Sequence, residues 1–130
     1  MATPVGVWNL VTNLHNAVLN IANMDAAGNV TGTIQMDSSH TYNITGTWNA
    51  QTNELKFSYS YSIVLKWFHE FFVVSFDGYL FEAGQPLFNA SPGPVATPAW
   101  NMLAGTYKVG PIFVNSGATY GWVARSQNQI

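Results

Sequence analysis

The chain repeats Val30-Thr-Gly-Thr-Ile34 as Ile44-Thr-Gly-Thr-Trp48 and as Leu103-Ala-Gly-Thr-Tyr107. Each copy places a Gly between two large apolar residues. In an extended strand successive side chains point to opposite faces, so the Gly and the two large residues share one face. A Gly between bulky inward residues relieves crowding where a sheet bends, and repeated bends close a sheet into a barrel. The pattern therefore predicts a curved sheet whose inner face carries the last residue of each copy.

Length and composition predict one domain with a weakly charged surface. The 130 residues are enough for a single hydrophobic core, so residues 1–130 are expected to form one barrel domain. Charged residues make up 8% of the chain, against about 25% in ordinary soluble domains. Asn, Thr, Ser and Gln carry the polarity instead, which suits extended sheets and burial in an oligomer. The four Lys and Arg are spread along the chain and form no basic patch for nucleic acid.

The chain also lacks the residues that several kinds of site require. It has no Cys, which excludes disulfides and thiolate metal sites. Its three histidines, His15, His40 and His69, show no metal-ligand spacing, so no metal and no cofactor are expected. No apolar run approaches the roughly 18 residues of a membrane helix, and no signal-peptide pattern opens the chain. We expect no membrane contact, and the compartment stays open between the cytoplasm and a mature secreted form.

A period of two in hydrophobicity governs the chain and predicts eight strands. They are expected over residues 5–11, 15–23, 30–36, 41–49, 55–65, 68–82, 100–109 and 118–125. Joined in order by turns, they predict an all-β fold, a single eight-stranded antiparallel up-and-down β-barrel. A hairpin turn at Asp77-Gly78 would split the sixth strand and give nine. Residues 83–99 contain four Pro and are expected to form a long loop, which would suit a lid over the barrel mouth.

The longest alternation, over residues 55–65, predicts a Tyr-rich inner face. Tyr59 and Tyr61 fall opposite Lys56, which marks the solvent side. Buried Tyr hydroxyls need partners, so successive inward Tyr indicate a wet or ligand-filled interior. The residues expected to line a ligand-binding cup are Trp48, Tyr59, Tyr61, Tyr107, Tyr120 and Trp122. The alternative is a packed core, because the side chains of an eight-stranded barrel can fill its interior.

The strand over residues 68–76 is apolar on both faces. Phe72 and Val74 share one face, while Phe71 and Val73 share the other. A strand that is apolar on both faces is covered on both. We therefore expect a homo-oligomer that associates through the Phe68–Phe76 strand, with cover by the loop 83–99 as the alternative.

Three short motifs follow one another over about the first 50 residues. Gly6-Val-Trp8 opens the first predicted strand. The second motif, Asp25-x-x-Gly28-x-x-Thr31-Gly-Thr33, spans a turn and the start of the third strand, and Tyr42-Asn-Ile-Thr-Gly46 lies in the fourth. In this order they resemble the first four strands of the avidin family, within the calycin group that also contains lipocalins and fatty-acid-binding proteins. The resemblance implies an eight-stranded barrel and the family's habit of forming tetramers.

The biotin contacts of that family have no counterpart here. The Tyr that follows Thr-Gly-Thr in avidins and holds the ureido oxygen is replaced by Ile34, and the Asn two residues after the Trp is replaced by Leu10. Residues 118–125 offer no match for the group that meets the ureido nitrogens. Each unpaired buried polar group would cost about 1–3 kcal/mol. The resemblance therefore implies the barrel and not biotin binding.

These observations favour a non-catalytic protein that binds a small hydrophobic or amphipathic ligand in the barrel mouth. A barrel enzyme, such as a cyclase or isomerase, is the main alternative. It would need an inward titratable group, and the candidates near the mouth are His69, Glu70 and Glu82. A carbohydrate-binding or self-assembling barrel is the third hypothesis.

Overall fold

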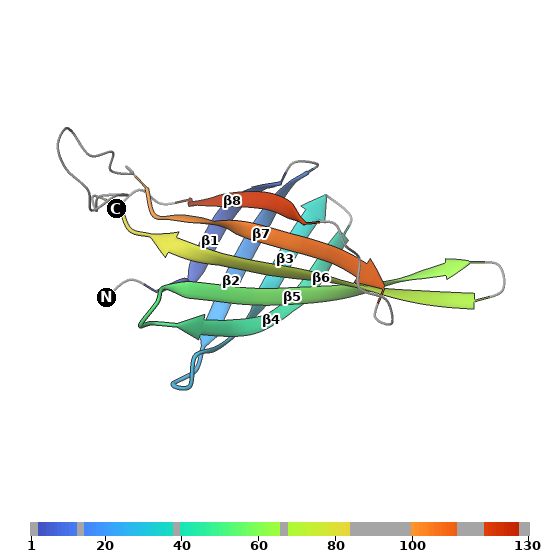
Figure 1. Ribbon diagram of the computed structural model, residues 1–130, viewed down its shortest axis with the longest axis horizontal. Coiled ribbons are helices and arrows are strands. Elements are labelled where there is room, and N and C mark those ends of the chain that lie inside the picture. Colours follow the sequence, from blue (N-terminus) through green and yellow to red (C-terminus); the bar gives the residue numbers. More distant parts are fainter. Residues whose placement is uncertain are drawn as a thin grey trace.

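A computed structural model describes residues 3–12, 15–37, 40–65, 68–83, 100–111 and 119–127, with only the backbone of residues 37, 63–65, 68–70 and 111. These residues form eight strands, each beginning and ending within two residues of its predicted range (Figure 1). They contain no helix that could cross a membrane. The strands are β1 (Gly6–Thr12), β2 (Asn16–Met24), β3 (Asn29–Asp37), β4 (His40–Asn49), β5 (Glu54–Leu65), β6 (Phe68–Phe81), β7 (Met102–Pro111) and β8 (Tyr120–Ser126). The predicted loop 83–99 lies outside the described residues after Ala83.

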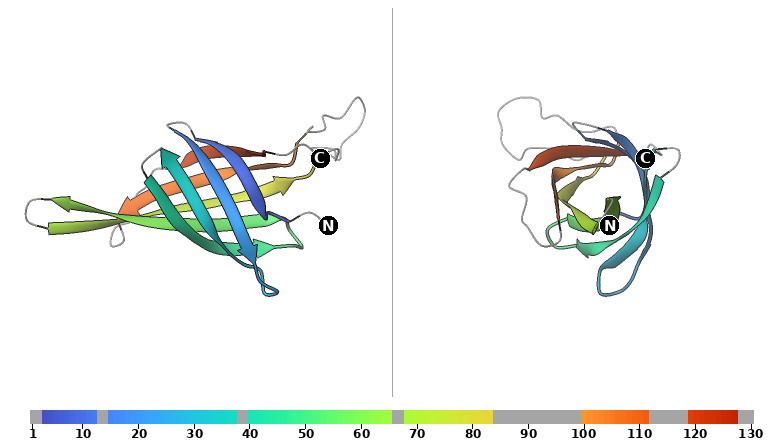
Figure 2. Two further views of the ribbon diagram at one scale, coloured as in Figure 1. Left: turned by 180° about the vertical axis from the view of Figure 1, so that it is seen from behind. Right: turned by 90° about the vertical axis from the view of Figure 1, so that its right-hand side faces the viewer.

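The eight strands close into one antiparallel up-and-down barrel, which confirms the predicted fold (Figure 2). Each strand pairs with the next along the chain, and β8 pairs with β1 from Trp8↔Ser126 to Thr12↔Trp122. The alternative hairpin at Asp77-Gly78 does not occur, since both residues lie inside β6 and pair with β5 and β7. An added Cβ at Gly78 would lie 2.6 Å from Trp122 Cζ2. This Gly therefore leaves room for an indole ring rather than turning the chain.

The inner faces of the strands form the hydrophobic core as the period-two pattern predicts. The large residues of all three copies of the repeated pattern are buried, namely Val30, Ile34, Ile44, Trp48, Leu103 and Tyr107. Leu19, Ile21 and Leu55 are fully buried beside them. The repeated pattern therefore identifies the inward side chains correctly on β3, β4 and β7.

The Gly of each copy lies where the neighbouring strand leaves no room for a side chain. A Cβ added at any of the three would overlap a backbone carbonyl oxygen of a neighbouring strand. The overlapping pairs are Gly32 with Asn20, Gly46 with Lys56, and Gly105 with Asp77. In each pair the carbonyl belongs to the residue just before the one that faces the Gly. The same close approach occurs at three places in the wall, so the repeated Gly permits the tight coiling that closes this small barrel.

The β5–β6 hairpin runs beyond the barrel wall (Figures 1 and 2). Its strands stay paired as far as Leu65↔Phe68, whereas β4 pairs with β5 only up to Thr45↔Ser58. On the outward face of the hairpin, the Phe71 side chain is 47% exposed. The side chains of this strand are described from residue 71 onward, and residues 71–74 place apolar side chains on both faces, as predicted.

Replacing Gly46 by Ala tests the role of the close approach. Where φ is negative, replacing Gly by Ala normally stabilises a protein by about 0.4–1 kcal/mol, because Ala lowers the conformational entropy of the unfolded chain. Here the new methyl group would meet the backbone of Lys56 and Phe57, so we expect Gly46→Ala to lower the free energy of unfolding by at least about 2 kcal/mol. Urea denaturation measures the change. Gly121→Ala is the control, because its Cβ would meet only Gly105 O at 3.9 Å. Equal stability of the two variants would contradict this account.

Candidate functional site

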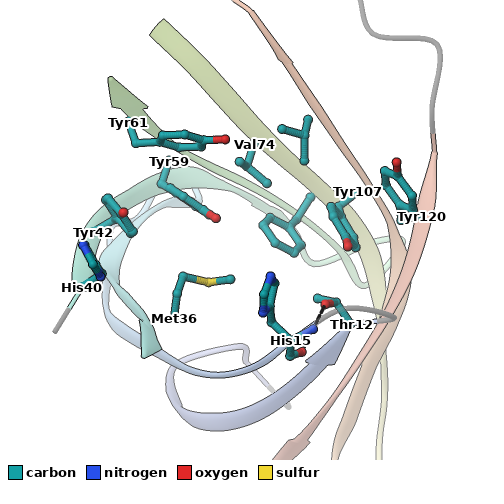
Figure 3. A pocket seen from close by; sticks show the side chains of 12 residues that line it. Thr12, His15, Met36, His40, Tyr42, Tyr59, Tyr61, Val74, Tyr107 and Tyr120 are labelled. Atoms are coloured by element: carbon teal, nitrogen blue, oxygen red, sulfur yellow. Dashed lines mark hydrogen bonds between the residues drawn. The ribbon is translucent and has the colours of Figure 1, made fainter. Parts of the chain in front are cut away.

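One end of the barrel holds an open cavity of about 530 Å³ (Figure 3). It lies where β1 ends and β2 begins, and seven of the eight strands, together with the β1–β2 turn, contribute side chains to it. Its lining consists of Thr12, His15, Met36, His40, Tyr42, Tyr59, Tyr61, Val74, Phe76, Tyr107, Val109 and Tyr120. This cavity is called the cup below.

Four of the six residues expected at the binding site line the cup: Tyr59, Tyr61, Tyr107 and Tyr120. Trp48 does not, because it lies at the opposite end of the barrel, where it borders a separate pocket with Asp25 and Gly28. Trp122 lies in the interior between the two ends. The interior is therefore open at one end and packed in the middle, so the predicted cup and the predicted packed core occupy different heights of one barrel.

Three rings form the floor of the cup. Phe57 and Phe76 stack with their centroids 4.6 Å apart. The Trp122 ring meets both edge-on, at 5.7 and 5.6 Å, and its Nε1 donates a hydrogen bond to Thr106 O at 3.0 Å. Phe76 belongs both to this floor and to the cup lining. Stacked and edge-on rings of this kind pack the barrel interior and close the cup from below.

Stacked aromatic rings form most of the wall. Tyr42 stacks on Tyr59 at 4.9 Å, Tyr107 stacks on Phe76 at 5.1 Å, and Tyr120 leans against Tyr107 at 5.3 Å. Because the ring faces are in contact with one another, edges and hydroxyl groups are left to meet a ligand. In Figure 3 the Tyr59 hydroxyl points into the cavity, and the Met36 side chain reaches toward it from the opposite wall.

Burial changes the pKa of two hydroxyl groups of this wall, those of Tyr59 and Tyr61. Burial, followed by the neighbouring Tyr61, Tyr42 and Tyr107, raises the pKa of Tyr59 to about 12. Burial and Tyr42 also raise the pKa of Tyr61. Among the described residues no fully buried side-chain polar atom lacks a hydrogen-bond partner. The cup therefore offers a ligand neutral hydroxyl groups that both donate and accept hydrogen bonds.

His15 and His40, for which the sequence shows no metal-ligand spacing, have exposed side chains that lie at the rim of the cup. The turn between β1 and β2 holds His15 there, since its backbone N donates to Thr12 Oγ1 at 2.9 Å and its carbonyl accepts from Thr12 N at 2.8 Å. The period-two pattern could have found both, because His15 is in phase with buried Ala17 and His40 with half-buried Tyr42.

The described residues provide little for metal binding or catalysis. No group of three or more His, Asp or Glu side chains among them could hold a metal ion. Of the acid–base candidates, Glu82 follows the end of β6 that lies away from the cup. The side chains of His69 and Glu70 lie outside the described residues.

Comparisons of this chain with protein-family models, curated proteins and solved structures found no match. The resemblance to avidins therefore stays a prediction from the motifs of the first strands. The function has to be inferred from the cup itself.

The pKa of Tyr59 gives a prediction for alkaline pH. An unfolded Tyr ionises near its ordinary value of 10.0, whereas folded Tyr59 keeps its proton to about 12. Between these values the native state binds more protons, so the free energy of unfolding falls as pH rises from about 10 to 12. We expect absorbance at 295 nm to show a late phenolate step, which Tyr59→Phe removes along with part of the pH dependence in urea denaturation. Tyr79→Phe, at an exposed outer position, should keep both.

Proposed function

We propose that this protein is a non-catalytic binding protein that holds a small hydrophobic or amphipathic molecule in the cup. The observation that carries the proposal is an open cavity of about 530 Å³ above a packed aromatic floor. Ligand pockets commonly enclose about 300–1,000 Å³ and combine apolar walls with a few placed polar groups. Five Tyr line this cavity and supply both kinds of surface.

The distribution of Tyr supports binding over a purely structural role. Where the barrel is packed, its interior contains Leu, Ile, Phe and Trp, as at Leu19, Phe57 and Trp122. Tyr replaces them where the barrel is open, at Tyr59, Tyr107 and their neighbours. Leu or Val would pack the same space without hydroxyls that need partners. A ligand with its own polar groups would provide such a partner for a hydroxyl that points into the cavity, as that of Tyr59 does (Figure 3).

Binding is also favoured over catalysis by the groups that the cup contains. General acid–base catalysis needs a group whose pKa lies near the working pH. The Tyr59 hydroxyl is moved away from that range by burial. No Asp, Glu or Lys is among the described residues that line the cup. Among the described residues that line the cup, a cyclase or isomerase would have to work through the rim histidines.

We propose in addition that copies of the chain associate through the β5–β6 hairpin. Beyond Ser58, β5 has no β4 partner among the described residues, so its outer edge presents unpaired backbone groups. The segment 59–65 reads Tyr-Ser-Tyr-Ser-Ile-Val-Leu and carries no charge that would repel an identical strand. Exposed Phe71 adds apolar surface on the outward face of the same hairpin.

Binding can be measured with N-phenyl-1-naphthylamine, an uncharged dye whose fluorescence rises in apolar sites. We expect saturable binding of one dye per chain, with displacement by retinol or a long-chain fatty alcohol and none by biotin. Val109→Trp fills the cup from its wall and should weaken binding at least about tenfold, or 1.4 kcal/mol. Val123→Trp makes the same change on the outer face and should bind as the unaltered chain does. Failure of every probe to bind would refute the proposed function.

Association through the hairpin is tested by placing a charge on its apolar surface. Light scattering after size exclusion should show an assembly larger than the 14.2 kDa chain. Phe71→Lys should convert it to monomer because like charges would face each other across the contact. Ser75→Lys, further along the same outward face, should leave the mass unchanged. A monomeric unaltered chain, or an assembly indifferent to Phe71→Lys, would contradict this proposal.

A further inference from the structure

The cup has no charged side chain among its described residues. The chain contains only four Lys or Arg and six Asp or Glu. Three of the four bases, Lys56, Lys108 and Arg125, are exposed at positions that alternate with buried core residues, so they point away from the interior. No positively charged side chain from β5, β7 or β8 therefore reaches the cup.

The rest of the charge inventory leads to the same conclusion. Asp25, Glu54, Asp77 and Glu82 lie on turns or outer faces, and none of them lines the cup. The internal segments 13–14, 38–39, 84–99 and 112–118 contain no Asp, Glu, Lys or Arg, so whatever their conformation they bring no charged side chain to the mouth. Lys66 lies outside the described residues, and Asp37 and Glu70 are described by backbone alone.

Among the described residues that line this cavity, an ionised ligand group would find no Lys, Arg, Asp or Glu as a counter-charge. Moving an unpaired carboxylate or sulfonate out of water into apolar surroundings is costly. The phenol of Tyr59 shows the effect within the protein itself, because burial and the adjacent Tyr61 hold its pKa at about 12 and so oppose a negative charge at that place. The cup therefore disfavours anions.

Cations are not favoured either. A quaternary ammonium site is built from aromatic faces that surround the cation. Here the faces contact one another, since Tyr42 and Tyr59 stack at an interplanar angle of 20° and Phe76 and Tyr107 at 23°. Hydroxyl groups and ring edges are left to meet the ligand, and they suit an uncharged molecule with hydroxyl or carbonyl groups.

We propose that the cup selects uncharged amphipathic ligands over their anionic counterparts, so that any ionised group of a bound molecule stays outside the mouth. The inference rests on the proposed binding function and specifies the class of ligand. It predicts that alcohols, amides and neutral ring systems bind, and that the corresponding carboxylates and sulfonates bind poorly.

Two dyes that differ by one charged group test the selection. 1-Anilinonaphthalene-8-sulfonate is N-phenyl-1-naphthylamine with a sulfonate added. Fluorescence titration of the unaltered chain should give a dissociation constant for the neutral dye at least about tenfold lower than for the sulfonate. Equal affinity for both dyes would overturn the selection while leaving binding in the cup intact. Binding of neither dye would instead refute the proposed function, and this inference with it.

A charge placed inside the cup should reverse the preference. Met36 reaches into the cavity (Figure 3), so Met36→Lys adds an ammonium group there and should improve sulfonate binding relative to the neutral dye at least about tenfold. Gln35→Lys adds the same charge on the exposed outer face and should leave the ratio of affinities unchanged. Val109→Lys provides a second inward position if Met36→Lys fails to fold, as judged by circular dichroism. An unchanged ratio in the folded inward variants would overturn the proposal.

Discussion

The barrel depends on three places where the backbone of one strand occupies the space of a neighbour's side chain. At Gly32, Gly46 and Gly105 a Cβ would overlap a carbonyl oxygen of the adjacent strand. Strands can approach in this way only when they coil strongly. Strong coiling is what allows eight short strands to return to their starting point, so that β8 pairs with β1. The repeated pattern links the curvature of the sheet to the filling of its interior, because each Gly is flanked on the same face by residues large enough to fill the barrel.

The division of the interior into a floor and a cup follows from the same geometry. Trp122 faces Gly105 across β7–β8, and Gly105 faces Gly78 across β6–β7. The missing side chains leave space for the indole, and Phe57 and Phe76 complete the plug. Above this level the pairing of β4 with β5 ends at Thr45↔Ser58. The rings of Tyr42 and Tyr59, one from each strand, stack beyond that point and line the cup.

The sequence predicts well which face of a strand a side chain lies on, and poorly how far along the barrel axis it lies. A period of two tells which side of a strand looks inward, and for this reason the eight strands and the inward Tyr could be predicted. It does not tell how far along the barrel axis a residue lies, because that depends on the stagger of all eight strands. Trp48 and Trp122 were expected beside Tyr59, but the register places Trp48 at the opposite end and Trp122 below the cup. His15 and His40 were not predicted as lining residues although they are in phase with Ala17 and Tyr42, because a polar side chain at a strand end does not stand out as part of an apolar inner face.

The Tyr residues at the open end favour an open cavity over a collapsed one. An apolar lining would gain free energy by collapsing inward and burying its surface. A Tyr lining cannot collapse in this way unless its hydroxyls find partners, because an unpaired buried hydroxyl costs about 1–3 kcal/mol. The stacked pairs Tyr42–Tyr59 and Phe76–Tyr107 brace the wall against that movement. The uncharged amphipathic ligand proposed for the cup would supply polar partners and apolar contact together, and would so stabilise the open, hydroxyl-lined arrangement.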